Sequence, residues 1–160
     1  MNTAKSSEYL KILSRLSVFQ GLDDAELQQV ASFTQKEKFG AGEIVFEDAS
    51  HGVDLYVVLS GKVNVQIESI IPNELLFLST IRPGEIFGEF ALVDEEPRSA
   101  TALCTMDSEM LIVNGHELNQ LFQENYHIGY IVIKNIARTI SSRIRRTNRM
   151  LLSAIRNRAK

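Results

Sequence analysis

A glutamate and an arginine stand nine positions apart in a stretch that is otherwise rich in apolar residues. Glu89 follows Gly88, and Arg98 precedes two small residues, Ser99 and Ala100. The planar guanidinium of an arginine can hold two phosphate oxygens at once. A carboxylate can accept hydrogen bonds from the hydroxyls of a sugar. The two side chains could therefore form a cradle for a phosphate group and a ribose.

The backbone between these residues favours the same chemistry. If a strand ends near Phe87 and a short helical turn begins at Glu89, the turn presents free N–H groups that bind anions. Gly88 has no side chain, so a ligand can approach the backbone there. The alternative is that Arg98 is a surface arginine, paired with one of the three acids at 94–96.

A β-rich core must position this stretch. Between residues 36 and 114, short runs rich in β-branched and aromatic residues alternate with turn signals. Strands spaced by roughly 8–12 residues are typical of a small barrel or sandwich. The predicted strands are Glu43–Phe46, Leu55–Leu59, Lys62–Ile67, Glu74–Ile81, Thr101–Leu103 and Met110–Val113.

Helices are predicted on both sides of the core. Apolar residues between positions 9 and 19 recur at helix spacing, and Asp23 or Asp24 can cap a second helix. After the core, Asn114 is a suitable N-cap for a helix over 116–124. We therefore expect 1–35 to form an N-terminal helical lead-in, 36–114 a β-unit, and 115–160 a C-terminal helical region.

The C-terminal segment combines a heptad pattern with a strong positive charge. Its apolar and small residues alternate at spacings of four and three: Ile133, Ala137, Ile140, Ile144, Thr147, Leu151 and Ala154. Residues 126–160 hold nine Lys/Arg and no acid, whereas residues 1–125 hold eight Lys/Arg and all 20 Asp/Glu. A helix of ~30 residues is ~45 Å long, longer than a small barrel can cover. We expect a homodimer through residues 133–154; packing on the chain's own barrel is the alternative.

Several classes of protein do not fit the composition. One cysteine, Cys104, excludes an internal disulfide framework, and the three scattered histidines have no metal-ligand spacing. No signal peptide and no apolar run of ~20 residues is present, so we expect a cytoplasmic protein without a membrane segment. No nucleophile–base pair stands out, which predicts a non-enzyme. The arginine-rich tail lacks a base-reading element, so nucleic-acid binding is not expected.

The stretch Gly88-Glu89-Phe90-Ala91-Leu92, five further residues, then Arg98-Ser99-Ala100 resembles the phosphate-binding cassette of the cyclic-nucleotide-binding domain family. That family includes the sensor domains of catabolite activator proteins and of the regulatory subunits of cAMP-dependent protein kinase. The likeness covers about residues 10–150. Its further matches are residues 16–22, 39–46, 54–63 and 82–89. It implies an α+β fold: an antiparallel, jelly-roll-like β-roll with a cassette at 86–100, N-terminal helices and a long C-terminal helix.

The resemblance also implies a role for each matching residue. Arg98 would pair with the cyclic phosphate, Glu89 would bind the ribose 2′-hydroxyl, and Ser99 would touch phosphate or purine. Backbone contacts would come from Gly88 and Ala91. The predicted ligand-binding set is completed by Phe90, Ala100 and Arg143. Arg143 would stack on the purine from the C-terminal helix, with Ser142 and Thr139 as alternatives for that role.

The expected ligand is cAMP, with cGMP as the alternative and no metal. We expect a stand-alone sensor that signals through a partner protein by ligand-linked movement of its C-terminal helix, because no helix-turn-helix segment follows that helix in the sequence. A rival interpretation is a scaffold whose pocket is vestigial or constitutively occupied. A cyclic dinucleotide is a further alternative, which the single phosphate cassette disfavours.

Overall fold

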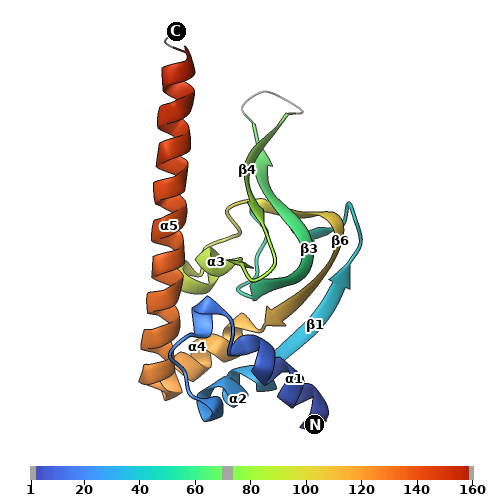
Figure 1. Cartoon of the computed structure of the whole chain (residues 1–160), viewed down its shortest axis with the longest axis vertical. Helices are drawn as coiled ribbons and strands as arrows, with labels where there is room; N and C mark the ends of the chain where they lie inside the picture. Colours follow the sequence, from blue (N-terminus) through green and yellow to red (C-terminus); the bar gives the residue numbers. More distant parts are fainter. Residues whose placement is uncertain (1–2, 70–73, 159–160) are drawn as a thin grey trace.

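A computed structural model describes residues 3–69 and 74–158. In this part of the chain, six strands form one antiparallel sheet that is rolled up beside a long C-terminal helix (Figure 1). The main path of the sheet runs β1 (Thr34–Phe39), β6 (Thr101–Val113), β3 (Leu55–Glu68), β4 (Leu75–Ile81). Two short strands join it, β2 (Ile44–Phe46) on β6 and β5 (Ile86–Phe87) on β3. The α+β fold predicted from the sequence is confirmed.

The N-terminal region consists of α1 (Thr3–Leu13), the 3-10 turn η1 (Ser17–Phe19) and α2 (Asp24–Ser32). The prediction of one helix through position 19 was wrong, because α1 ends at Leu13 and Leu16 is extended. A local hydrogen bond helps to terminate α1, because the Ser14 hydroxyl donates to the Lys11 carbonyl at 3.1 Å. Of the two residues predicted as the N-cap of α2, Asp23 takes that role and forms a capping box with Glu26.

The described sheet contains six strands, as many as the sequence predicts, but the chain is divided among them differently. The runs Leu55–Leu59 and Lys62–Ile67 are parts of β3, and the runs Thr101–Leu103 and Met110–Val113 are parts of β6. Register shifts near Ser60 and Lys62 let β3 bend while its pairing with β6 continues. The turn expected between the two predicted runs of β3 is therefore a β-bulge. Strand β1 was not predicted, since its charged sequence TQKEKF lacks an apolar alternation.

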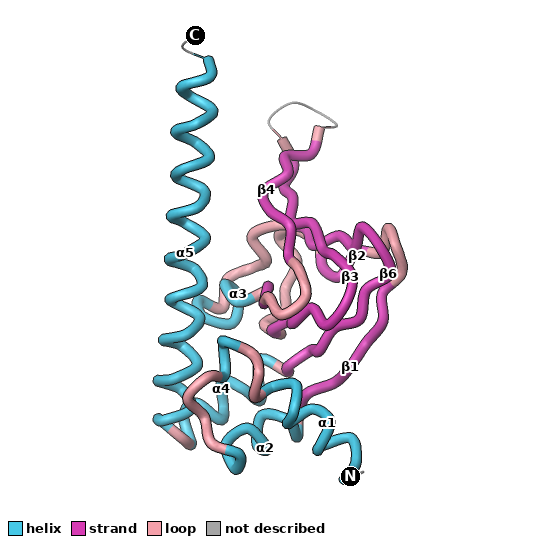
Figure 2. The backbone as a smooth tube through the Cα atoms, in the orientation of Figure 1, coloured by secondary structure: helices cyan, strands magenta, loops and turns pink. Residues whose placement is uncertain are grey.

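Alternate residues of β3 face two separate apolar clusters. Leu55 and Val57 pack in a cluster shared with the helices, while Tyr56 and Val58 pack inside the roll. The helices α1, α2 and α4 (Gly115–Glu124) gather at one end of the roll (Figure 2). Asn114 caps α4 as predicted, because its side chain accepts a bond of 3.0 Å from the Glu117 N–H.

The last helix, α5 (Tyr126–Arg158), has 33 residues. It begins before the predicted dimer seam, the heptad-spaced residues between 133 and 154. Its first turns are buried in the core through Ile128, Val132 and Ile136. The remainder extends past the roll in the same direction as the β3–β4 hairpin (Figure 1). Large apolar side chains are exposed along this part: Ile144, Met150, Leu151, Leu152 and Ile155. Within the described residues, no helix is both long and apolar enough to cross a membrane.

Candidate functional site

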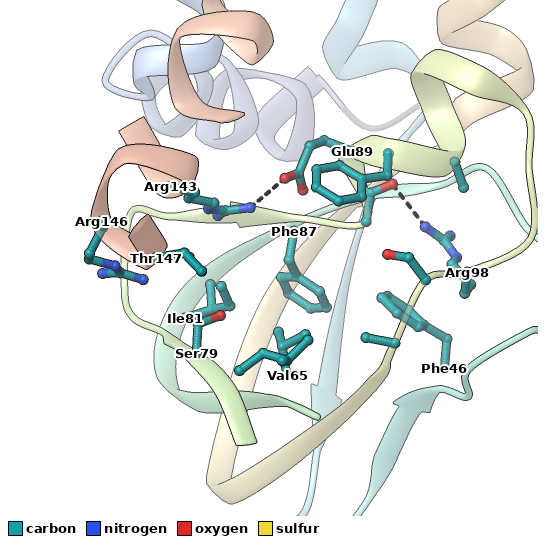
Figure 3. Close-up of a pocket in the computed structure, with 16 residues that line it drawn as sticks. Phe46, Val65, Ser79, Ile81, Phe87, Glu89, Arg98, Arg143, Arg146 and Thr147 are labelled. Carbon is teal, nitrogen blue, oxygen red and sulfur yellow. Dashed lines mark hydrogen bonds and ion pairs between the residues drawn. The ribbon is translucent and has the colours of Figure 1, made fainter. Parts of the chain in front are cut away.

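A cavity of about 190 Å³ lies between the roll and α5. All eight predicted ligand-binding residues line it: Gly88, Glu89, Phe90, Ala91, Arg98, Ser99, Ala100 and Arg143. Figure 3 shows Arg98 on one side of this cavity and Arg143 on the opposite side, on α5. The fold therefore brings the cassette and the C-terminal helix together as the sequence predicts.

Gly88 links β5 to the short helix α3 (Glu89–Asp94), which matches the predicted helical turn. Its backbone is left-handed, with φ of 78°. A Cβ at this position would lie 2.7 Å from Arg98 Nη1 and 2.9 Å from the carbonyl oxygen of Asp54. Any other residue would strain the left-handed backbone and clash with these two atoms, so glycine is required here. Gly88 thereby lets the Arg98 guanidinium come close to the backbone.

Arg98 is a buried cation with only 4% of its surface exposed. Its Nη1 donates to the Gly88 carbonyl at 2.9 Å and its Nη2 to the Asp54 carbonyl at 3.0 Å. Its Nε is buried without a hydrogen-bond partner in the described residues. Within the same residues no carboxylate forms a salt bridge with Arg98, so the alternative of a surface arginine paired at 94–96 is wrong.

Two aromatic rings surround this guanidinium. Its central carbon lies 4.3 Å from the centroid of the Phe46 ring and 5.6 Å from that of Tyr56. Burial lowers the pKa of Arg98, while Tyr56, Asp54 and Glu89 act in the opposite direction. The guanidinium still stays charged at neutral pH. A buried charge without a counter-ion is unfavourable, so the site is electrostatically prepared for an anion.

Glu89 is almost fully buried and forms an ion pair with Arg143. The second terminal nitrogen of Arg143 donates to the Ile86 carbonyl. The Arg143 side chain thus connects α5 to both β5 and α3 (Figure 3). The alternatives for its predicted role, Thr139 and Ser142, line a neighbouring cavity instead.

Sequence reasoning missed half of the lining: Phe46, Val65, Leu78, Ser79, Ile81, Phe87, Arg146 and Thr147. Five of these eight residues lie on β2, β3 and β4, and only the strand pairing brings them to the cassette. Thr147 could have been found from the sequence, because it follows Arg143 by four residues and so shares its helix face.

The arrangement suits a ligand with a particular distribution of polar groups. Arg98 offers a positive charge at one side, and Glu89 offers a buried acceptor near the centre. Apolar side chains, including Val65, Ile81 and Phe87, form a wall suitable for a flat ring system. Across residues 3–69 and 74–158, no group of three or more His, Cys, Asp or Glu side chains is arranged to hold a metal ion.

Known proteins share both the sequence pattern and the fold. The chain matches the cyclic nucleotide-binding domain family over residues 36–125. It is 32% identical to the cyclic AMP receptor protein of Thermus thermophilus over 80% of this chain and 57% of that protein. It is 27% identical to a CRP-like cAMP-activated global transcriptional regulator of Mycobacterium tuberculosis, over 91% of this chain and 62% of that protein.

A solved structure has the same fold. A cyclic nucleotide-binding domain from Methylobacillus flagellatus aligns with a TM-score of 0.79 and 21% identity, over 93% of this chain and 83% of that chain. The two curated relatives are longer, and the chain spans only 57% and 62% of their lengths. The family match covers more than half of this chain and includes the whole cassette. The chain therefore belongs to the cyclic nucleotide-binding domain family.

Proposed function

We propose that this chain is a cytoplasmic, non-enzymatic sensor of a cyclic mononucleotide, with cAMP as the preferred ligand and cGMP as the alternative. The observation that carries the proposal is the buried Arg98 guanidinium, which has no carboxylate partner among the described residues, in a cavity that also presents Glu89. Two curated relatives are named for cAMP, which supports the choice of purine.

The proposed binding mode gives each side of the cavity one part of the ligand. The cyclic phosphate pairs with Arg98, aided by Ser99 and the backbone N–H groups of Gly88 and Ala91. The ribose 2′-hydroxyl donates to Glu89. Phe90 and Ala100 contribute apolar contacts at the edge of the cavity. The purine then lies against the apolar wall and α5.

Nucleotide binding would change the contacts of α5. Arg143 already holds the carboxylate of Glu89, so the ribose must share or displace this ion pair. The cavity of about 190 Å³ is also smaller than the ~300 Å³ at the lower end of typical ligand pockets. Both features support an outward shift of α5 on binding, followed by stacking of Arg143 on the purine. A ligand biases such a shift only through its difference in affinity for the two states.

We further propose that α5 transmits the signal through a homodimer formed by residues 133–154 and through a partner protein. Supporting this, the seam residues Ile144 and Leu151 are exposed in the single chain. The rival interpretation remains a scaffold whose pocket is vestigial or constitutively occupied. One observation favours it: Arg143 already engages one oxygen of the Glu89 carboxylate, the proposed ribose acceptor.

Calorimetric titration tests the function. The protein is unfolded and refolded to remove nucleotide carried from the expression host, then titrated with cAMP and cGMP, and with 5′-AMP as an open-phosphate control. The sensor predicts saturable binding of cAMP near one per chain, with cGMP weaker. No heat of binding from any nucleotide, in protein that is folded by circular dichroism, would favour the scaffold.

A further inference from the structure

A second cavity of about 380 Å³ lies beside the first one, between α5, the segment around η1, and the turn joining β4 to β5. Arg138, Arg143 and Arg146 line it, together with Ser142 and one acid, Glu85. Arg143 and Arg146 also line the first cavity, whereas Arg138 does not. The two cavities are therefore neighbours that share part of one wall.

One face of α5 supplies these groups. Arg138, Ser142 and Arg146 follow one another at intervals of four residues, which places them in a row. Two helical turns separate the two arginines, about 12 Å at 1.5 Å per residue. Arg143 lies between them along the helix, but its guanidinium is turned toward Glu89 and the Ile86 carbonyl.

The charges around this cavity are not balanced. Arg138 donates to the neutral Asn135 side chain at 3.1 Å, and in the described residues neither Arg138 nor Arg146 has a carboxylate within salt-bridge distance. The charge of Arg143 is offset by Glu89. One oxygen of Glu85 is already engaged, accepting a bond of 2.7 Å from the Arg82 backbone N–H.

The side of the cavity near η1 is held in place. Asn135 is 8% exposed, and its side-chain amide donates to the carbonyls of Val18 at 3.1 Å and Gln20 at 2.9 Å. These two bonds fasten the lead-in segment to α5. Because Arg138 is bonded to the same Asn135 side chain, its guanidinium has a fixed neighbour at one end of the cavity.

We propose that this second cavity is a binding site for a phosphate-class oxyanion, held by Arg138 and Arg146 with the Ser142 hydroxyl between them. One guanidinium can bind two phosphate oxygens at once. Two guanidiniums that have no carboxylate partner among the described residues suit a ligand with more than one negative charge. The site shares Arg146 with the lining of the first cavity, but it does not include Arg98, on which the proposed nucleotide site depends. Four arginines and two glutamates line the two cavities, so a singly charged cyclic nucleotide leaves positive charge uncompensated.

The test uses inorganic pyrophosphate as the probe, titrated calorimetrically at low ionic strength into the full chain. The variants are Arg138→Gln and Arg98→Gln, and Arg145→Gln is the matched control. Arg145 is exposed on the same helix and lines neither cavity. Loss of a charged hydrogen-bond donor weakens binding about tenfold or more. We expect that loss for pyrophosphate in Arg138→Gln, and wild-type affinity in Arg145→Gln and Arg98→Gln.

Three results would overturn the proposal. Absence of saturable pyrophosphate binding to the wild type would show that no such site exists. Equal weakening in Arg145→Gln would reveal a diffuse attraction to the basic helix. Loss of binding in Arg98→Gln would place the pyrophosphate in the first cavity. Failure of cAMP binding, with pyrophosphate binding intact and sensitive to Arg138, would contradict the proposed function but leave this second site standing.

Discussion

At the scale of single residues, Gly88 is where backbone geometry and ligand chemistry meet. Its left-handed φ and its closeness to Arg98 Nη1 both exclude a side chain. In Gly88→Ala we expect cAMP affinity to fall at least about tenfold and unfolding free energy to fall by about 1–3 kcal/mol. Calorimetric titration and urea unfolding measure the two effects.

The control for this variant is Gly84→Ala. Gly84 also has a positive φ, of 86°, but a Cβ there has no heavy atom within 4 Å. It should lose stability from backbone strain and keep its cAMP affinity. If Gly84→Ala lost as much affinity as Gly88→Ala, the clash with Arg98 would not be the reason for the loss.

The role of Glu89 can be tested with a ligand that lacks one hydroxyl. A hydrogen bond to a charged group contributes about 1.5–3 kcal/mol, so the wild type should prefer cAMP over 2′-deoxy-cAMP at least about tenfold. Glu89→Gln keeps the shape of the side chain, removes its charge, and should reduce this preference several-fold. Titration of both ligands into both proteins measures the coupling between hydroxyl and carboxylate. An unchanged preference would place the hydroxyl elsewhere.

At the scale of elements, α5 joins three parts of the molecule. One face of its first half is buried in the core, and its middle reaches the cassette through Arg143. Its last turns expose apolar side chains. The proposed dimer assigns these exposed residues to a seam. Leu151 lies on the seam and Leu152 lies next to it, and both are about equally exposed, at 58% and 59%.

The seam predicts different effects for this neighbouring pair. Leu151→Gln should weaken dimerisation by tenfold or more, because a buried leucine side chain contributes about 1.5–3 kcal/mol. Leu152→Gln makes the same chemical change off the seam and should have a smaller effect. Sedimentation equilibrium measures both dissociation constants. A monomeric wild type at high concentration, or equal effects of the two variants, would contradict the predicted seam.

Short-range signals explain which elements were predictable. Asp23 and Asn114 cap helices with bonds to residues three positions away, so their roles can be read locally. The short helix after Gly88 depends on similarly local geometry. In contrast, β1 exists because it pairs with β6, more than 60 residues later in the chain. Its charged sequence gives no sign of that partner.

The same distinction holds for the candidate site. Its predicted residues are close in sequence, except Arg143, whose position followed from a family resemblance. Val65 and Ile81 reach the cavity only because β3 pairs with β4, with Val63 opposite Ile81. The ion pair between Arg143 and Glu89 could not have been predicted, since it depends on how closely α5 packs against α3.

At the scale of the whole molecule, the candidate site lies where an acidic body meets a basic tail. Residues 1–125 carry all 20 acidic residues, and the tail from 126 onward carries nine basic residues and no acidic one. Arg143 and Arg146 of this tail line the cavity formed by the acidic body. A ligand that compensates Arg98 and contacts Arg143 would therefore act at the junction of the two parts.

The most direct measurement of the central claim is a cAMP titration of nucleotide-free wild type, Arg98→Gln and Arg82→Gln. Arg82 is exposed and lines neither cavity, so its variant controls for the loss of one positive charge. The account predicts saturation near one cAMP per chain for the wild type and Arg82→Gln. Removing the charged partner of a buried phosphate costs about 2–5 kcal/mol, so Arg98→Gln should bind at least about thirtyfold more weakly. Wild-type affinity in folded Arg98→Gln would contradict the assignment of this site.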